Sequence, residues 1–223
     1  MDNSDTVVSG SILVDSNGLV QCIGECNATA GADIYTSNGG IVLPGTVSVG
    51  AYVGLLEVES EDNSLDGTAQ VFDGEAIRAV DGVTFNTFDP RHMYSAWAGG
   101  VTTIVAGPIS SEVVAGISVA FSSHGITVND ALIQEEVSLN VNIGNKAKTG
   151  SLASSISGQF AYLRSLFRAN STAFVQVMDG TLPLVVFVDQ VDQIASLLRL
   201  KKEFSFNLVI VGNVRFSLHF LIF

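Results

Sequence analysis

The sequence is short of charged residues and contains no hydrophobic run long enough to cross a membrane. Charged residues make up only 14% of the 223 residues, whereas hydrophobic residues make up 47%. This balance excludes a disordered chain and is typical of a protein with many buried strands. No apolar stretch reaches the roughly 18 residues that a membrane-spanning helix needs. Residues 1–5 are polar and acidic, unlike a secretory signal. We therefore predict a cytoplasmic protein with no membrane partner.

Positive charge is scarcer still. Ten Lys and Arg residues face 22 Asp and Glu residues, which gives a net charge of −12. A nucleic-acid partner is excluded because it would require a basic patch. Much of the acidic charge lies between residues 57 and 73, where we predict a solvated loop. A cation-binding loop is the alternative, although its carboxylates lack the spacing of a calcium loop.

Cysteine is limited to Cys22 and Cys26. A zinc site needs four ligands, and no second pair of cysteines exists. On a continuous strand the two would lie about 13 Å apart, too far for a disulfide, although a turn at Gly24 would bring them closer. Without a secretory signal, we predict free or buried thiols.

Histidine is almost as rare, with three residues in the chain. We predict that His92 lies on a helix surface, that His124 lies in a loop, and that His219, in the apolar C-terminal segment, either packs or is disordered. The catalytic alternatives are an acid–base pair of His92 with Asp89 and a nucleophile pair of His124 with a preceding serine. Only geometry could support the pair of His92 with Asp89, and no third orienting group can be assigned to the pair of His124 with serine.

The hydrophobic pattern predicts a β-rich start followed by alternating strands and helices. Asp15–Gly18 is a hairpin turn signal because Asn-Gly tolerates positive φ. Residues 115–143 have β-prone pieces without a clear assignment. The alternation after them favours parallel βα units. The expected elements are strands at 6–8, 11–14, 19–24, 33–35, 40–43, 46–56, 101–106, 184–188 and 207–212, and helices at 90–98, 151–168 and 191–204; we expect both faces of the strand at 46–56 to be covered.

Several motifs occur in the order found in one enzyme family. They are GLVQCIG at 18–24, GIVLPG at 40–45, GGVTTI at 99–104, LPLVVFVD at 182–189 and LVIVG at 208–212. Together they resemble the metal-dependent amidohydrolase superfamily, and the imidazolonepropionase-like amidohydrolases in particular. The resemblance implies an α/β fold with a (β/α) barrel after a small β-sandwich-like domain. We accordingly predict an N-terminal β-rich domain at 1–45 and a partial barrel at 46–223. A full barrel takes about 250 residues, so this one would be incomplete and the chain truncated.

The family's metal ligands are missing from this sequence. The resemblance places the usual histidines near Gly50, Tyr52, Phe187 and Gly212, and none of these residues can hold zinc. Asp189 is the remaining polar residue at a site-like position, although N-capping of the following helix, together with Asp192, is its simpler role. Glu135 and Glu136 are adjacent on a predicted strand and would face opposite sides, so they would not chelate one metal together; one of them at a strand end is the alternative.

The resemblance implies a hydrolase of carbon–nitrogen bonds other than peptide bonds, and the missing ligands predict that this chain is inactive. We expect no catalytic residue, no cofactor-binding residue and no metal ligand. The alternatives are a non-enzymatic protein that binds a small molecule or a partner on the same scaffold, and a degenerate fragment. We also expect the protein to self-associate through the open edges of the incomplete barrel, since unpaired strand edges pair with other strands.

Overall fold

The computed structural model describes residues 9–37, 39–56, 66–68, 76–85 and 91–212. The predicted strand at 6–8, most of the acidic stretch, Asp89 and His219 lie outside these residues. The chain divides into two compact units, Met1–Leu43 and Pro44–Phe223. The assignment of domains at 1–45 and 46–223 stays a prediction.

The first unit contains one hairpin, formed by β1 (Ser11–Val14) and β2 (Val20–Gly24), which pair antiparallel. The predicted turn forms between them. The Asp15 carboxylate accepts hydrogen bonds from the N–H groups of Asn17 and Leu19, both at 2.9 Å, and Gly18 has φ of +78°. The predicted strands at 33–35 and 40–43 do not form, and Tyr35 is 92% exposed. With only two paired strands in the described part of this unit, the expected β-sandwich-like arrangement is a single sheet.

Cys22 and Cys26 form a disulfide, so the prediction of free thiols is wrong. The Cα atoms are 5.8 Å apart because strand β2 ends between the two cysteines. Gly24 has φ of +109°, and the Cys26 N–H donates a hydrogen bond of 3.1 Å to the Gly24 carbonyl. The chain therefore turns at Gly24, where an extended strand would have kept the sulfurs apart.

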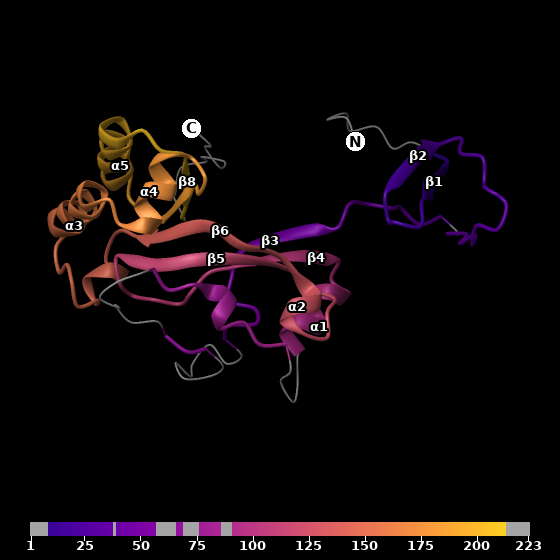
Figure 1. The fold of residues 1–223 in the computed structure, drawn as a ribbon, viewed down its shortest axis with the longest axis horizontal. Coiled ribbons are helices and arrows are strands. Elements are labelled where there is room, and N and C mark those ends of the chain that lie inside the picture. The colour runs from indigo at the N-terminus through magenta and orange to yellow at the C-terminus, as the bar shows by residue number, and fades with distance from the viewer. Residues whose placement is uncertain (1–8, 38, 57–65, 69–75, 86–90, 213–223) are drawn as a thin grey trace. The chain divides into compact units, whose positions relative to one another are not determined.

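The second unit is a curled, six-stranded half-barrel sheet with helices against it (Figure 1). The strands lie in the same order in the sheet as in the sequence, from β3 to β8. The pairs β3–β4, β6–β7 and β7–β8 are parallel, as the alternating pattern predicted for the later strands. The strands are β3 (Thr46–Ala51), β4 (Val101–Ala106), β5 (Val114–Ser122), β6 (Leu132–Asn142), β7 (Leu184–Phe187) and β8 (Leu208–Val211).

Strand β5 departs from the expected barrel because it is antiparallel to both β4 and β6. The connections around it are short: residues 107–113 precede it, and residues 123–131, with the short helix α2 (Val128–Ala131), follow it. Such connections suit antiparallel neighbours, whereas a parallel pair needs a longer crossover. The segment at 115–143 thus forms one long hairpin within the sheet.

Strand β3 is shorter and more exposed than the sequence predicts. The predicted strand at 46–56 ends at Ala51, and Val47 and Val49 are 55% and 60% exposed. β3 lies at an edge of the sheet, with β4 as its only described neighbour. The expectation that both faces of this strand are covered is therefore wrong.

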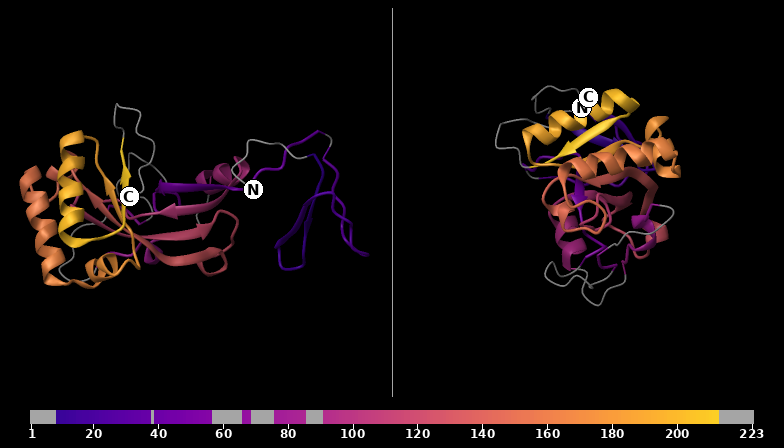
Figure 2. Two further views of the ribbon diagram at one scale, coloured as in Figure 1. Left: turned by 90° about the horizontal axis from the view of Figure 1, so that it is seen from above. Right: turned by 90° about the vertical axis from the view of Figure 1, so that its left-hand side faces the viewer.

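The helices bury the outer face of the sheet in two clusters. The larger cluster packs β5 to β8 against three helices, and the smaller one packs β4 and β5 against the first helix and a 3-10 turn. The guanidinium groups of Arg164 and Arg168 in α3 (Ile156–Ala169) each lie 2.9 Å from the carboxylate of Glu203 in α5 (Val191–Phe204). These two helices lie side by side (Figure 2). The elements are α1 (Arg91–Ala98), α3 (Ile156–Ala169), α4 (Thr172–Met178) and α5 (Val191–Phe204), with 3-10 turns η1 (Ala79–Asp81) and η2 (Lys146–Lys148).

The ends of α3 and α5 follow local sequence signals. The Ser155 hydroxyl accepts a hydrogen bond of 3.1 Å from the Gly158 N–H and begins α3 later than predicted. Asn170 ends α3 with φ of +52°. The predicted helix at 191–204 matches α5, and the stop at Gly99-Gly100 follows α1 as expected. Helix α4 was not predicted.

Candidate functional site

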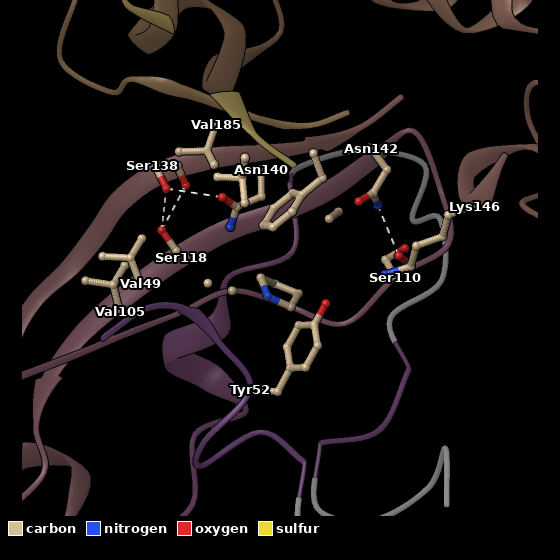
Figure 3. A pocket seen from close by; sticks show the side chains of 16 residues that line it. Val49, Tyr52, Val105, Ser110, Ser118, Ser138, Asn140, Asn142, Lys146 and Val185 are labelled. Atoms are coloured by element: carbon tan, nitrogen blue, oxygen red, sulfur yellow. Dashed lines mark hydrogen bonds between the residues drawn. The ribbon is translucent and has the colours of Figure 1, made fainter. Parts of the chain in front are cut away.

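A pocket opens on the inner face of the half-barrel, at the carboxyl ends of the parallel strands (Figure 3). Gly50, Phe187 and Val211 contribute from the ends of β3, β7 and β8, and Asn142 contributes from the end of β6. Because β5 runs the other way, its amino-terminal half reaches the same edge and adds Ser118. Ligand sites of barrel proteins lie at this end of the strands.

The pocket contains three of the four positions that the resemblance assigned to metal ligands: Gly50, Tyr52 and Phe187. A Cβ atom at Gly50 would lie 3.8 Å from the Phe187 ring. Gly50 has φ of +77° and lies where the register of β3 against β4 shifts. At the fourth position, Val211 lines the pocket, whereas Gly212 packs against the backbone carbonyl of Val188.

The residues of this pocket do not fit a zinc ion. Zinc takes imidazole nitrogen, thiolate sulfur or carboxylate oxygen. The described residues that line the pocket include no His, Cys, Asp or Glu. Across the described part of the chain, no group of three such side chains is placed to hold a metal.

Hydroxyl and amide groups of β5 and β6 form a buried network on the inner face. Ser118 Oγ and Ser138 Oγ are 2.6 Å apart, and Ser138 Oγ donates to Asn140 Oδ1 at 3.2 Å. Asn142 Nδ2 donates to the carbonyls of Ser110 and Glu112, at 3.0 and 2.9 Å. These bonds fix the two asparagine side chains at the pocket wall.

These residues were not among the predicted site residues, although the sequence contains a signal for them. Ser138, Asn140 and Asn142 alternate with Leu139 and Val141, which belong to the core cluster behind the sheet. A period of two places the polar residues on one face of a strand. Polar residues on the inner face of a predicted barrel strand mark a site rather than a packed interior.

The pocket has one charged lining residue among those described, Lys146. It belongs to η2, which follows β6 after residues 143–145, and Gln159 of α3 bonds to this connecting segment. Gln159 is fully buried; its Oε1 accepts from the Gly144 N–H at 2.9 Å and its Nε2 donates to the Gly144 carbonyl at 3.0 Å. This pair of bonds anchors the segment that carries Lys146 to helix α3.

Glu135 and Glu136 are not among the residues that line the pocket, and both contact the same arginine. Arg78 contacts Glu135 Oε2 at 2.7 Å and Glu136 Oε1 at 3.1 Å. The prediction that these adjacent glutamates face opposite sides fails because β6 contains a bulge at this point. Ser138 pairs with Ser118 and Gln134 pairs with Ala120, so four residues of β6 span the same length as two residues of β5. The hydrogen bond to Glu135 raises the pKa of Arg78.

Asp189 is exposed and is not among the residues that line the pocket, so its site-like position stays a prediction. It does not cap α5, since the N-cap residue is Gln190; Asp192 lies in the first turn as expected. Asp66, from the described part of the acidic region, has a raised pKa because of burial and of repulsion from Asp81.

The structure tests one of the two predicted histidine pairs, that of His124 with a preceding serine, because Asp89, the predicted partner of His92, lies outside the described residues. His92 is exposed on α1, as predicted. His124 is exposed in the loop after β5, with its ring stacked on Trp97 at 5.6 Å. Ser122 Oγ interacts with the backbone N–H and carbonyl of His124 rather than with its imidazole.

No helix among the described residues is both long and apolar enough to span a bilayer.

Comparison with known proteins connects this fold with one enzyme class. No family model and no curated protein matches the sequence. The crystal structure of an amidohydrolase from Thermotoga maritima MSB8 matches the chain with a TM-score of 0.79 and 25% sequence identity, and the match covers 89% of this chain. This chain spans 58% of the length of that amidohydrolase chain. The chain therefore has an amidohydrolase-like scaffold, which supports the resemblance seen in the sequence at that coarse level.

Proposed function

We propose that this protein is an amidohydrolase-like protein that does not itself hydrolyse carbon–nitrogen bonds. The observation that carries the proposal is the chemistry at Gly50, Tyr52 and Phe187. The sequence resemblance places the family's metal ligands at these positions, which line the strand-end pocket, and their side chains supply no usual zinc ligand. In this family a metal ion polarises the carbonyl and activates the attacking water, so a chain that binds no metal would not catalyse the hydrolysis. The finer assignment, to the imidazolonepropionase-like amidohydrolases, depends on the sequence motifs.

The proposal is tested on the purified full chain by elemental analysis and by a hydrolysis screen with amides and cyclic amidines. We expect less than a tenth of an equivalent of zinc, on the order of adventitious metal, and no turnover above background. One equivalent of zinc per chain, with activity that a chelator abolishes, would overturn the proposal.

Restoring the ligands tests whether the pocket has the geometry of a lost metal site. We expect the triple variant Gly50→His, Tyr52→His, Phe187→His to bind zinc more tightly than the wild type, because a Cβ atom at residue 50 would lie 3.8 Å from the ring at position 187. The φ of +77° at Gly50 strains any side chain there, so the double variant Tyr52→His, Phe187→His is measured beside it. The variant removes the Phe187 ring, which leaves room for imidazoles. A matched control places one added histidine at the exposed Val47 on β3. Equal zinc affinity in the control and the triple variant would contradict the proposed geometry.

A second candidate function, non-enzymatic binding of a small molecule, is favoured by the pocket itself. Polar groups of Asn140, Lys146 and Tyr52 converge on it, and valines form much of the remaining wall. A few placed polar groups in a mainly apolar pocket are typical of a ligand site. A rise in melting temperature with added ligand is the expected sign of such binding.

We also propose self-association through the edge of the sheet at β3. Val47 and Val49 leave more than half of their surface exposed, at 55% and 60%, on a strand with one described neighbour. Exposed apolar edge strands pair with other chains, and a lysine on the edge prevents this. Light scattering at increasing concentration should show oligomers for the wild type and fewer for Val47→Lys. A monomer at all concentrations would contradict the proposal.

A further inference from the structure

We propose that the disulfide between Cys22 and Cys26 is a redox-sensitive switch, which thiol reductants open reversibly in the folded protein. The oxidised form holds the chain that follows β2 against β1, and the reduced form releases it. The switch lies in the small unit, Met1–Leu43, and is independent of the function proposed for the pocket.

The small unit has no hydrophobic core that would shield the disulfide. None of its described residues, 9–37 and 39–43, is buried, and both cysteines are partly exposed. Ile12 and Ile23, which pair across the hairpin, leave 41% and 56% of their surface exposed. An attacking thiolate can therefore approach the bond without unfolding of the chain. Exposed disulfides are the ones that serve as labile or regulatory bonds, whereas structural disulfides resist reduction.

The loop that the disulfide closes is short, since Cys22 and Cys26 are four positions apart in the sequence. In the chain-entropy model, a cross-link stabilises a fold less when it closes a shorter loop. The pairing of β1 with β2 also lies mostly outside this loop, because the turn between the two strands precedes Cys22. Opening the bond therefore leaves the hairpin connected and changes the chain locally.

The backbone between the cysteines adopts a turn that the closed bond requires. The Cα atoms of Cys22 and Cys26 are 5.8 Å apart, whereas four steps of extended strand would separate them by about 13 Å. Gly24 has φ of +109°, which glycine adopts readily and other residues do not. The Cys26 N–H donates to the Gly24 carbonyl at 3.1 Å. Once the bond is open, residues 24–26 can extend, so the two redox forms differ in backbone conformation.

Ser11 of β1 binds the turn in its closed form. The Ser11 hydroxyl donates to the Gly24 carbonyl at 3.0 Å and accepts from the Cys26 N–H at 3.3 Å. Gly10 permits this approach, because a Cβ atom there would overlap the Gly24 backbone. Beyond the turn, the described residues 27–37 form no strand or helix that would hold them to β1. Loss of the turn therefore releases this segment from the hairpin.

The switch opens by thiol–disulfide exchange. The thiolate of one reductant molecule attacks one sulfur of the disulfide and forms a mixed disulfide, and the other cysteine leaves as a thiolate that takes up a proton. A second reductant thiolate attacks the reductant sulfur of the mixed disulfide and releases the remaining cysteine. The protein gains two electrons and two protons, and two reductant thiols become one disulfide. The reverse steps close the switch.

The experiment equilibrates the ¹⁵N-labelled full chain at neutral pH, without denaturant, in buffers with a rising ratio of reduced to oxidised glutathione. A maleimide then labels the thiols for mass spectrometry, and NMR records the backbone amides of parallel samples. We expect both cysteines to become labelled within the range of these buffers and to close again on return to oxidised glutathione. The amide signals of residues 24–37 should shift with the opening, and those of Pro44–Phe223 should stay in place.

Variants test whether the turn controls the bond. Ser11→Ala removes contacts of the closed form, so the value of [GSH]²/[GSSG] at half-opening should fall about fivefold, the effect of one net hydrogen bond. Gly24→Ala strains the same turn and should lower this value at least about fivefold. Ser16→Ala is the matched control, since Ser16 is exposed in the turn between β1 and β2 and should leave the value unchanged. The double variant Cys22→Ser, Cys26→Ser should have the NMR spectrum of the reduced wild type in residues 27–37.

Three results would overturn the proposal. A bond that stays closed in the most reducing glutathione buffer, and opens only when urea is added, would be a structural cross-link. Opening that leaves the amide signals of residues 24–37 in place would show that the bond does not control the conformation of this segment. Equal half-opening values for the wild type, Ser11→Ala and Gly24→Ala would show that the turn and the bond are not coupled.

Discussion

The sharpest test of how the pocket is built is the substitution Gln159→Met. Gln159 is fully buried in α3, and both ends of its amide bond to the backbone of Gly144, at 2.9 and 3.0 Å. Methionine has a similar length and shape, so the substitution leaves little empty space. What it removes is the partner of a buried N–H and of a buried carbonyl. The substitution thus isolates the polar contacts from the packing.

The expected loss of stability follows from those two backbone groups. Each buried group left without a partner costs about 1–3 kcal/mol, and the added apolar surface of methionine offsets part of this. We expect Gln159→Met to lower the free energy of unfolding by about 2–4 kcal/mol. Urea denaturation monitored by circular dichroism measures the difference, with the exposed Gln134→Met on β6 as the control, for which we expect a change within about 0.5 kcal/mol.

A second readout links this contact with the pocket. The Gly144 backbone leads directly to Lys146, so releasing it should also weaken ligand binding at the pocket. A loss of less than about 1 kcal/mol, with unaltered binding, would refute the idea that Gln159 holds this segment in place.

Three further perturbations test other parts of the structure. Hydrogen bonds from two arginines of α3 hold the pKa of Glu203 below its ordinary value of 4.5. The ion pair therefore stabilises the fold above that pH, and the stabilisation is lost as the pH falls through the lowered pKa. In a series of denaturation measurements at decreasing pH, the stability difference between wild type and Glu203→Gln should vanish. Reduction of the disulfide between Cys22 and Cys26 should lower the protection of the β1 and β2 amides from hydrogen exchange. It should leave the melting temperature of Pro44–Phe223 unchanged, because both cysteines belong to the other unit. A lower melting temperature of the large unit would contradict this expectation. Leu163→Ala, at a fully buried position of α3, should cost about 2–5 kcal/mol in urea denaturation, and a loss below about 1 kcal/mol would mean that the cluster repacks.

Elements with strong local signals could be predicted from the sequence. The turn at Asp15–Gly18 and the helix at 191–204 formed as expected because their determinants are close in the chain: a glycine with positive φ in one case, and an apolar stripe in the other. Helix α4 was missed because Thr172–Met178 is short and contains β-branched residues, which have no strong helix preference. Its formation depends on burial of Phe174 and Val177 in the larger core cluster.

Properties that depend on distant partners could not be predicted in the same way. The direction of β5 depends on which strands it meets, and its apolar sequence, nearly all buried, is compatible with either direction. The exposure of Val47 accompanies the position of β3 at an edge of the six-stranded sheet, which local sequence does not determine. The pocket positions Gly50, Tyr52 and Phe187 came from the resemblance. The alternation around Asn140 indicates one face of a strand, whereas knowing that this face lines the pocket required the register of β6 against β5 and β7.

The sheet grows one strand at a time along the chain, with each strand beside its predecessor. The two turns that join β4, β5 and β6 enclose far less chain than the helical crossovers on either side, so the entropy lost in closing them is smallest there. Folding of the sheet is thus expected to start from this central meander and to add β3 on one flank and β7 and β8 on the other. Such a layout lets the outer strands be lost or added during evolution while the nucleus continues to assemble.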